Sequence, residues 1–180
     1  MRVIAGRLGG QMFSAPKGHK THPMSEKARG AIFSILGDIS GLRVLDAFSG
    51  SGALVIEALS RGADSAVAID SDIDAFKVIK SNIDKLKLNK HIKVIRANTS
   101  SWSDNNQNTR FDLVLCDPPY NNLQINLLKK IVIHVKKDGL LVLSLPGNEN
   151  IIEFDAFKVV KQKAYGDIRV VVYRSCEMTE

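Results

Sequence analysis

The sequence contains few cysteines and no long apolar run. Its two cysteines, Cys116 and Cys176, lack the close spacing of metal ligands, and Cys116 lies in an apolar segment typical of a buried, reduced thiol. No stretch of about 18 apolar residues occurs, so we expect no membrane span. The first residues, MRVIAGRLGG, lack the apolar segment of a secretory signal. These absences argue against a disulfide-rich secreted domain, a cysteine-based zinc site and a membrane protein. They predict a cytoplasmic protein without a bound metal.

The basic residues are unevenly distributed along a chain whose length fits one domain. The formal net charge is +6, of which residues 1–37 contribute +5 and the remaining 143 residues only +1. A basic segment joined to a nearly neutral body indicates a polyanionic partner, and nucleic acid is the best match. The candidate nucleic-acid contacts are Arg2, Arg7, Lys17, Lys20, His22, Lys27 and Arg29.

Residues 1–24 differ in pattern from residues 25–180. The first part contains short strand-like pieces interrupted by glycine, RVIAG, RLGG and QMFSAP, followed by the loop KGHKTHPM. We interpret it as a small, basic N-terminal β-hairpin arm in front of a larger domain. His19 and His22 in the loop are either exposed side chains or nucleic-acid contacts, and the sequence favours neither.

From Ser25 onward, apolar runs alternate with amphipathic segments. Ser25 can cap a helix that ends at Gly37 or Gly41. The alternation predicts parallel crossover units and a doubly wound, mostly parallel α/β sheet with a C-terminal antiparallel hairpin. The polar segment DNNQNT is typical of a disordered connection. The predicted strands are 42–48, 65–70, 92–98, 111–117 and 139–146, the helices are 53–62, 73–88 and 123–136, and the hairpin strands are 157–166 and 167–175.

A polar side chain lies at or near the carboxyl end of each of four predicted strands, namely Asp46, Asp70, Asn98 and Asp117. One such residue would indicate only a cap for the next helix. Four of them favour a shared crevice, because ligands of open α/β sheets bind beyond the carboxyl ends of the strands.

The loop DAFSGSGA (46–53) follows the first of these strands. Gly50 and Gly52 allow a tight turn and a close approach of the backbone to a ligand. The third position of a dinucleotide fingerprint is Val55, no phosphate-loop lysine follows, and Asp46 would repel a pyrophosphate but attract a cation. S-adenosylmethionine fits, because it has a ribose, an adenine, an ammonium and a sulfonium but no phosphate. Its candidate ligands are Asp46, Ser49, Gly50, Ser51, Gly52, Asp70 and Asn98.

The segment DPPY follows the fourth strand. Asp117 and the carbonyl of Pro118, stiffened by Pro119, offer two acceptors for the hydrogens of an exocyclic amine. They would direct the lone pair of that amine at a methyl donor. Tyr120 offers a face on which a base can stack, an interaction worth roughly 1–3 kcal/mol. A rigid strand end explains the prolines but not the flanking Asp117 and Tyr120, so we assign these four residues to catalysis.

These motifs resemble the bacterial 16S rRNA guanine-N2 methyltransferases of the RsmD type. The resemblance implies a Rossmann-like class I methyltransferase fold with S-adenosylmethionine as cofactor. It also implies that the acceptor is guanine 966 of 16S rRNA, within the assembled small subunit. By motif, it assigns Asp46, Gly50, Gly52, Asp70 and Asn98 to the cofactor and residues 117–120 to the target base. We also expect a monomer. The matching stretches are RVIAG (2–6), RVLDAFSGSGALVIEALSRGA (43–63), IDSDIDAFKVIKSNI (69–83), LVLCDPPY (113–120) and YGD (165–167).

The chain departs from this family in the stretch HPMSEKARG (22–30), where the family has Arg-Pro-Thr, an acidic residue and Arg-Glu. His22, Met24 and Gly30 replace arginine, threonine and glutamate. Two other functions compete. DPPY also occurs in DNA adenine-N6 methyltransferases, although this chain is short for a DNA-recognition domain. A non-catalytic RNA-binding assembly factor would have no need for intact DAFSGSG and DPPY.

Overall fold

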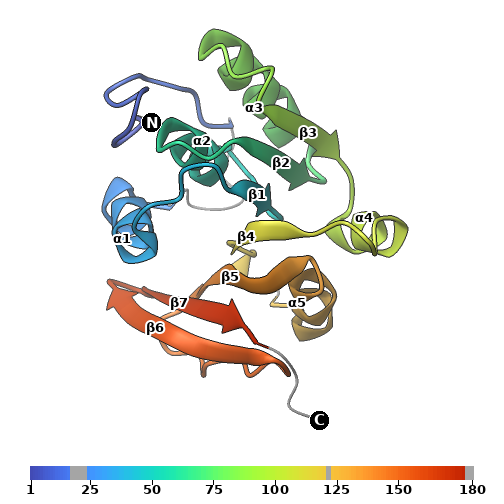
Figure 1. Ribbon diagram of the computed structural model, residues 1–180. Coiled ribbons are helices and arrows are strands. Elements are labelled where there is room, and N and C mark those ends of the chain that lie inside the picture. The colour runs from blue at the N-terminus through green and yellow to red at the C-terminus, as the bar shows by residue number, and fades with distance from the viewer. Residues whose placement is uncertain (17–23, 121–122, 177–180) are drawn as a thin grey trace.

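In the computed structural model, seven strands form one sheet between two layers of helices (Figure 1). The structure describes residues 1–16, 24–120 and 123–176. No helix in these ranges is long and apolar enough to cross a bilayer. In chain order the elements are α1 (Glu26–Leu36), β1 (Arg43–Asp46), α2 (Ala53–Ser60), β2 (Ser65–Asp70), α3 (Ile73–Lys85), β3 (Ile92–Arg96), α4 (Thr99–Asn105), β4 (Phe111–Cys116), α5 (Ile125–Val132), β5 (Val135–Pro146), β6 (Phe157–Tyr165) and β7 (Ile168–Ser175).

The two faces of the sheet bury different apolar clusters, because successive side chains of a strand point to opposite faces. Val44 and Leu113 pack in the cluster that contains α1, α2 and α3. Leu45 and Val114 pack in the cluster that contains Trp102 of α4 and the apolar side of α5. Figure 1 shows α1, α2 and α3 on one side of the sheet and α4 and α5 on the other. The predicted doubly wound architecture is therefore confirmed.

The strand order is β3-β2-β1-β4-β5-β7-β6, with β7 antiparallel to both of its neighbours. The remaining pairs are parallel, so the carboxyl ends of β1 to β5 meet at one edge. The order reverses at β1, which has β2 on one side and β4 on the other. In sheets of this type the ligand crevice lies at such a reversal. The antiparallel C-terminal hairpin confirms that part of the predicted fold class.

Two parts of the predicted element pattern are wrong. The segment predicted as a disordered connection overlaps α4, whose first turn is capped by Asn98 through hydrogen bonds from the backbone N–H groups of Ser100 and Ser101. The helix predicted for 123–136 ends at Val132, and β5 begins at Val135 rather than at 139. The bounds of α1 agree with the prediction, since Ser25 caps it and Gly37 ends it.

The N-terminal segment 1–16 shares the core of the larger domain. It forms a single antiparallel bridge, between Arg2 and Met12, so its hairpin is minimal. Val3, Leu8 and Phe13 are buried in the cluster of α1, α2 and α3. The segment is therefore packed on the domain rather than extended from it.

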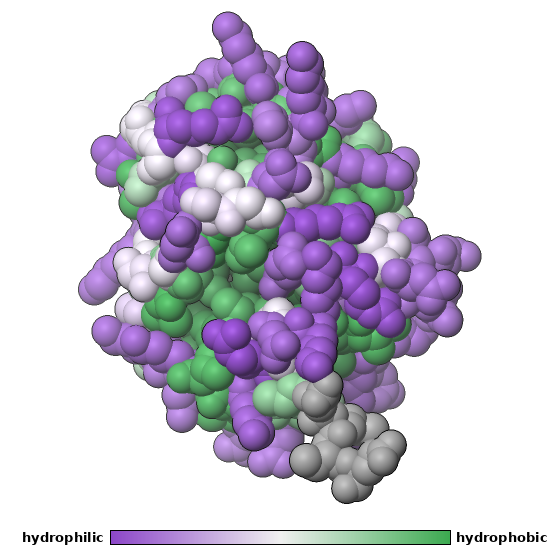
Figure 2. All heavy atoms as spheres, viewed as in Figure 1, coloured by the Kyte–Doolittle hydropathy of each residue, from purple (hydrophilic) through white to green (hydrophobic). Residues whose placement is uncertain are grey.

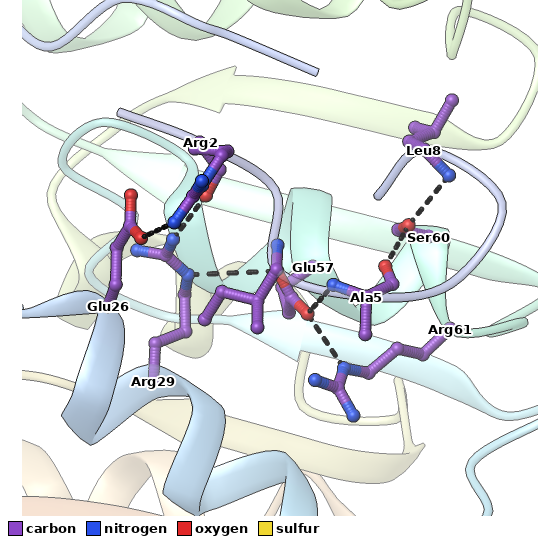
Figure 3. Close-up of polar contacts among 9 residues, drawn as sticks. Arg2, Ala5, Leu8, Glu26, Arg29, Glu57, Ser60 and Arg61 are labelled. Carbon is purple, nitrogen blue, oxygen red and sulfur yellow. Dashed lines mark hydrogen bonds and ion pairs between the residues drawn. The ribbon is translucent and has the colours of Figure 1, made fainter. Parts of the chain in front are cut away.

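A buried carboxylate, Glu57 of α2, anchors this segment (Figure 3). It accepts hydrogen bonds from the backbone N–H groups of Ile4 (2.8 Å) and Ala5 (3.1 Å) and from Nε of Arg61 (2.7 Å). The guanidinium of Arg29 lies beside it, with Nε 3.8 Å from Oε2, and donates to the carbonyl of Arg2 at 2.6 Å. Three elements distant in sequence thus converge on one side chain.

The prediction that Arg29 contacts nucleic acid is wrong for this structure, because its side chain has no exposed surface. Burial lowers the pKa of its guanidinium, and the charge of Glu57 opposes that shift. A charge count treats every arginine as a surface cation. Here one of them compensates a buried carboxylate instead.

Candidate cofactor and target-base site

The loop between β1 and α2 is held by hydrogen bonds to the neighbouring strand. The backbone N–H of Ser49 donates to the carbonyl of Ile69 (2.9 Å), and its hydroxyl donates to the carbonyl of Asp46 (3.0 Å). The backbone N–H of Gly50 donates to Oδ2 of Asp70 at 2.7 Å. The ends of β1 and β2 are therefore linked at the point where the sequence predicts a cofactor.

The two glycines of this loop have different surroundings. Both have positive φ, 51° at Gly50 and 78° at Gly52. A Cβ at Gly50 would meet no atom of the described part of the chain within 4 Å, so the backbone there borders open space. A Cβ at Gly52 would lie 3.3 Å from the side chain of Ile79 on α3. Gly50 leaves room for a ligand, whereas Gly52 allows close packing of the loop on a helix.

Asp46 is fully buried, and neither of its carboxylate oxygens has a hydrogen bond of normal geometry among the described residues, although the backbone N–H groups of Phe48 and Val55 lie near enough to oppose a rise of its pKa. Burial, together with the nearby carboxylates of Asp117 and Asp70, raises the pKa of Asp46 to about 8. Because a buried charge without a partner is costly, this position favours either a proton or a bound cation. The influence of Asp117 and Asp70 also places three of the predicted strand-end residues close together.

Asp70 and Asn98 both have structural partners. Asp70 accepts from Gly50 and, through Oδ1, from the backbone N–H of Asp72 at 2.9 Å. Each of its oxygens still has a further acceptor direction. Asn98 uses its Oδ1 to cap α4, so a ligand contact at this residue would come from its Nδ2, which is a donor.

The carboxylate of Asp117 is oriented by two hydroxyls. Ser144 of β5 donates to its Oδ1, and the hydroxyl of Tyr120 donates to the same oxygen at 3.3 Å. Burial raises the pKa of Asp117, and the two hydroxyls oppose that shift. Pro118 is buried, whereas Pro119 and Tyr120 are exposed at the surface. The DPPY segment therefore presents a fixed carboxylate beside an accessible aromatic ring.

Sequence reasoning did not identify Ser144, Phe48 or Thr99. Ser144 is the only hydroxyl-bearing residue in the apolar run GLLVLSLP. A single polar residue in a buried strand is the one feature of the sequence that could have indicated a role for it. Thr99 donates to the carbonyl of Ala47 at 2.8 Å and so joins α4 to the cofactor loop. A cavity of about 60 Å³ beside the DPPY segment is lined by Phe48, Pro118, Pro119, Gln124, Leu127 and Leu128.

Only some of the residues predicted to contact nucleic acid lie in the described part of the chain. Arg7 and Lys27 are exposed, and Arg2 is exposed while paired with Glu26 at 3.1 Å. Lys17, His19, Lys20 and His22 lie outside the described residues. With Arg29 buried, three of the predicted cations are accessible in the described part of the chain.

Comparison with known proteins gives one consistent family. Residues 1–174 match the family described as "Conserved hypothetical protein 95". The relative named "Putative rRNA methyltransferase YlbH" from Bacillus subtilis is 33% identical, over 97% of this chain and 98% of its own. "Ribosomal RNA small subunit methyltransferase D" of Buchnera aphidicola is 30% identical, over 95% of this chain and 91% of its own. The solved structure "Putative methyltransferase yhhF from Escherichia coli" has a TM-score of 0.87 at 25% identity and covers 98% of both chains.

Proposed function

Because the chain belongs to the Conserved hypothetical protein 95 family and is an S-adenosylmethionine-dependent rRNA methyltransferase of the RsmD type, we propose that it methylates the exocyclic N2 of a guanine in 16S rRNA, namely guanine 966. The observation that carries this proposal is the position of Asp117. Its carboxylate is fixed by Ser144 and Tyr120, and it lies close enough to the unpartnered Asp46 to raise the pKa of that residue.

The residues present fit S-adenosylmethionine, which supplies the methyl group when bound. The unpartnered carboxylate of Asp46 is suited to the ammonium of the cofactor, and its burial would strengthen that attraction. The open space beside Gly50 admits the ligand, with Ser49, Ser51 and Gly52 shaping the loop. Asp70 would accept from the ribose hydroxyls. Asn98 would donate from Nδ2 to a ring nitrogen of the adenine.

The target amine would lie against the DPPY segment. Its two N–H groups would donate to Asp117 and to the carbonyl of Pro118. That geometry directs the nitrogen lone pair toward the methyl group, and orientation of this kind supplies much of the rate enhancement in bimolecular reactions. Tyr120 would stack on the guanine. On accepting the methyl group that the bound cofactor would supply, the amine would lose one proton to Asp117 or to water.

The substrate would be a single-stranded loop of small-subunit RNA. A base in a duplex has to leave its stack to reach such a pocket, which costs least in a loop. The exposed cations Arg2, Arg7 and Lys27 would contact phosphates near it, and Lys17, Lys20 and His22 would extend that contact. We further propose that the enzyme acts as a monomer on assembled small subunits.

Radiolabelled cofactor tests this function directly. The full chain is incubated with small subunits that lack the modification, with free 16S rRNA and with DNA, and the labelled nucleotide is mapped. We expect label on N2 of one guanine of 16S rRNA, no label on DNA, and no label with the Asp117→Ala variant. Label on adenine N6 of DNA would contradict the proposal, and so would an unlabelled RNA after incubation with a folded, cofactor-binding enzyme.

A further inference from the structure

The C-terminal hairpin, residues 157–175, is strongly basic. It carries a net charge of +4, whereas residues 38–156 and 176–180 together carry −3. Every residue of β6 from Lys158 to Ala164 is exposed, so both faces of this strand are accessible. Figure 2 shows hydrophilic side chains along the lower edge of the molecule, where Figure 1 places β6. The basic residues of the hairpin are Lys158, Lys161, Lys163, Arg169 and Arg174.

Strand register connects this hairpin to the target-base site. Lys163 pairs with Val170 of β7, and Val170 pairs with Ser144 of β5, the residue that donates to Asp117. Paired residues point to the same face of a sheet, so Lys163 shares a face with Ser144. Two interstrand spacings separate their backbones, or about 10 Å. Lys161 pairs with Val172 and therefore lies on this face as well.

An open hollow lies near the turn between β6 and β7, at the end of the hairpin that carries Lys163. It measures about 310 Å³ and is lined by Gln162, Lys163, Ala164 and Arg169. Arg169 donates to the carbonyls of Gly147 (2.9 Å) and Glu149 (3.0 Å), which fixes one wall of the hollow. The ammonium of Lys163 lies 5.4 Å from the centroid of the Tyr165 ring. The hollow therefore contains the ammonium of Lys163 and the side-chain amide of Gln162, and Arg169 forms its fixed wall.

We propose that this face of β6 binds the RNA strand that flanks the target guanine, with Lys161 and Lys163 contacting its phosphates. The inference rests on the proposed function and adds an RNA contact in the C-terminal hairpin to the contact proposed for the N-terminal part of the chain. The occupant is a polyanion because the surface is basic while the rest of the domain is acidic. It is the flanking strand because Lys163 is in register with Ser144, which donates to Asp117, and Lys161 lies on the same face.

Lysines on an edge strand have another common use, which is to prevent the strand from pairing with a second molecule. Charge reversal separates the two uses. A glutamate pair on β6 protects the edge as well as a lysine pair does, but it repels phosphate. A defect of the Lys161→Glu/Lys163→Glu variant in RNA binding therefore reports on RNA contact rather than on edge protection.

The experiment measures KM and kcat, with assembled small subunits and with free 16S rRNA as substrates, for the wild type and for three double variants. In Lys161→Glu/Lys163→Glu we expect KM to rise at least tenfold with kcat and cofactor affinity unchanged. In Lys161→Gln/Lys163→Gln the plot of log affinity against log salt should become shallower by about 1.4, the value for two phosphate contacts on a single strand. The control is Lys85→Glu/Lys90→Glu, an equal charge change at two exposed positions, the last residue of α3 and a residue between α3 and β3.

Unchanged KM in the β6 variants would overturn the inference, and so would an equal rise in the control, because that would indicate only an effect of net charge. A defect on assembled subunits that is absent on free RNA would also overturn it, since it would indicate a ribosomal protein as the partner. If the wild type itself transfers no methyl group to RNA, the proposed function fails instead. Circular dichroism and gel filtration establish that each variant is folded and of unchanged oligomeric state.

Discussion

At the scale of single residues, Asp46 stands out as a buried carboxylate to which no described residue donates a hydrogen bond of normal geometry. Its pKa of about 8 lies above the ordinary value of 3.8, so the folded state holds a proton that the unfolded state releases. The contribution of this residue to stability therefore falls as the pH rises from about 4 to about 8. A bound cation would remove that penalty, which links the stability of the free protein to its affinity for cofactor.

We predict that Asp46→Asn is more stable than the wild type at pH 8 in the absence of cofactor. The gain should be of the order of a few kcal/mol, because each pKa unit corresponds to about 1.4 kcal/mol. This gain in stability should vanish near pH 4, where residue 46 is uncharged in the folded state of both proteins. Loss of a charge-assisted hydrogen bond should weaken cofactor binding by roughly 10- to 100-fold. Urea denaturation at the two pH values and calorimetry check these changes, and equal stability at pH 8 would contradict the burial argument.

A second residue-scale prediction concerns Ser144. Its hydroxyl stabilises the ionised form of Asp117, so Ser144→Ala should raise the pKa of that carboxylate. Because the amine needs an ionised acceptor, the acid limb of the kcat profile should move to higher pH. Asp117→Asn serves as the control, since it should lose most activity at every pH. A Ser144→Ala profile that superposes on the wild type would show that the hydroxyl does not tune Asp117.

The sequence predicted some site residues and missed others for identifiable reasons. Asp46 and Asp117 follow apolar runs directly, so their place at the edge of a parallel sheet could be inferred. Ser144 acts through a strand that is neighbouring only in three dimensions, and no spacing along the chain reveals that. Arg29 looked like a surface cation because its partner, Glu57, belongs to a different helix.

At the scale of elements, the cofactor loop and α2 depend on two glycines with different functions. Gly50→Ala places a methyl group into open space and should lower cofactor affinity, with only about 1–2 kcal/mol of backbone strain. Gly52→Val forces a side chain against Ile79 and should lower the free energy of unfolding by more. Parallel measurement of unfolding and of cofactor binding separates the effects. Equal destabilisation by both variants would contradict the assignment.

The attachment of the N-terminal segment to α2 gives another element-scale prediction. Glu57→Gln leaves the guanidinium of Arg29 buried without a compensating charge, and removal of one partner from such a pair costs about 3–5 kcal/mol. Urea denaturation should show this loss. Glu26→Gln removes an exposed partner of Arg2 and should leave the midpoint unchanged. Equal urea midpoints for Glu57→Gln and Glu26→Gln would show that Glu57 does not anchor the N-terminal segment.

The elements that could be predicted from the sequence are those in which apolar residues form a clear run or recur at the period of a helix. Strands β1, β2 and β4 are apolar runs with clear ends. Helix α4 was missed because TSSWSDN contains residues with weak helix propensity, and its stability comes from the cap at Asn98 and the burial of Trp102. The start of β5 was missed because Val135 to Gly139 lacks an apolar run, and only Val135 of that stretch pairs with β4, opposite Phe111, before the register shifts.

At the scale of the whole molecule, the positive charge lies in two separate parts of the chain. The count along the sequence indicated one basic arm on a nearly neutral body. That body is in fact a basic hairpin of +4 together with an acidic remainder of −3, which cancel in the sum. The proposed docking of RNA therefore uses the N-terminal segment and the C-terminal hairpin, with the crevice of β1 and β4 belonging to the acidic remainder.

The central claim is that the carboxyl ends of β1 and β4 bring a methyl donor and a guanine amine together at Asp117. A crystal structure of the protein with S-adenosylmethionine tests it most directly. The account predicts the cofactor ammonium beside Asp46 and its methyl group facing Asp117, with an open approach along Tyr120 wide enough for a base. A cofactor bound away from β1, or a methyl group turned from Asp117 toward a closed wall, would contradict it.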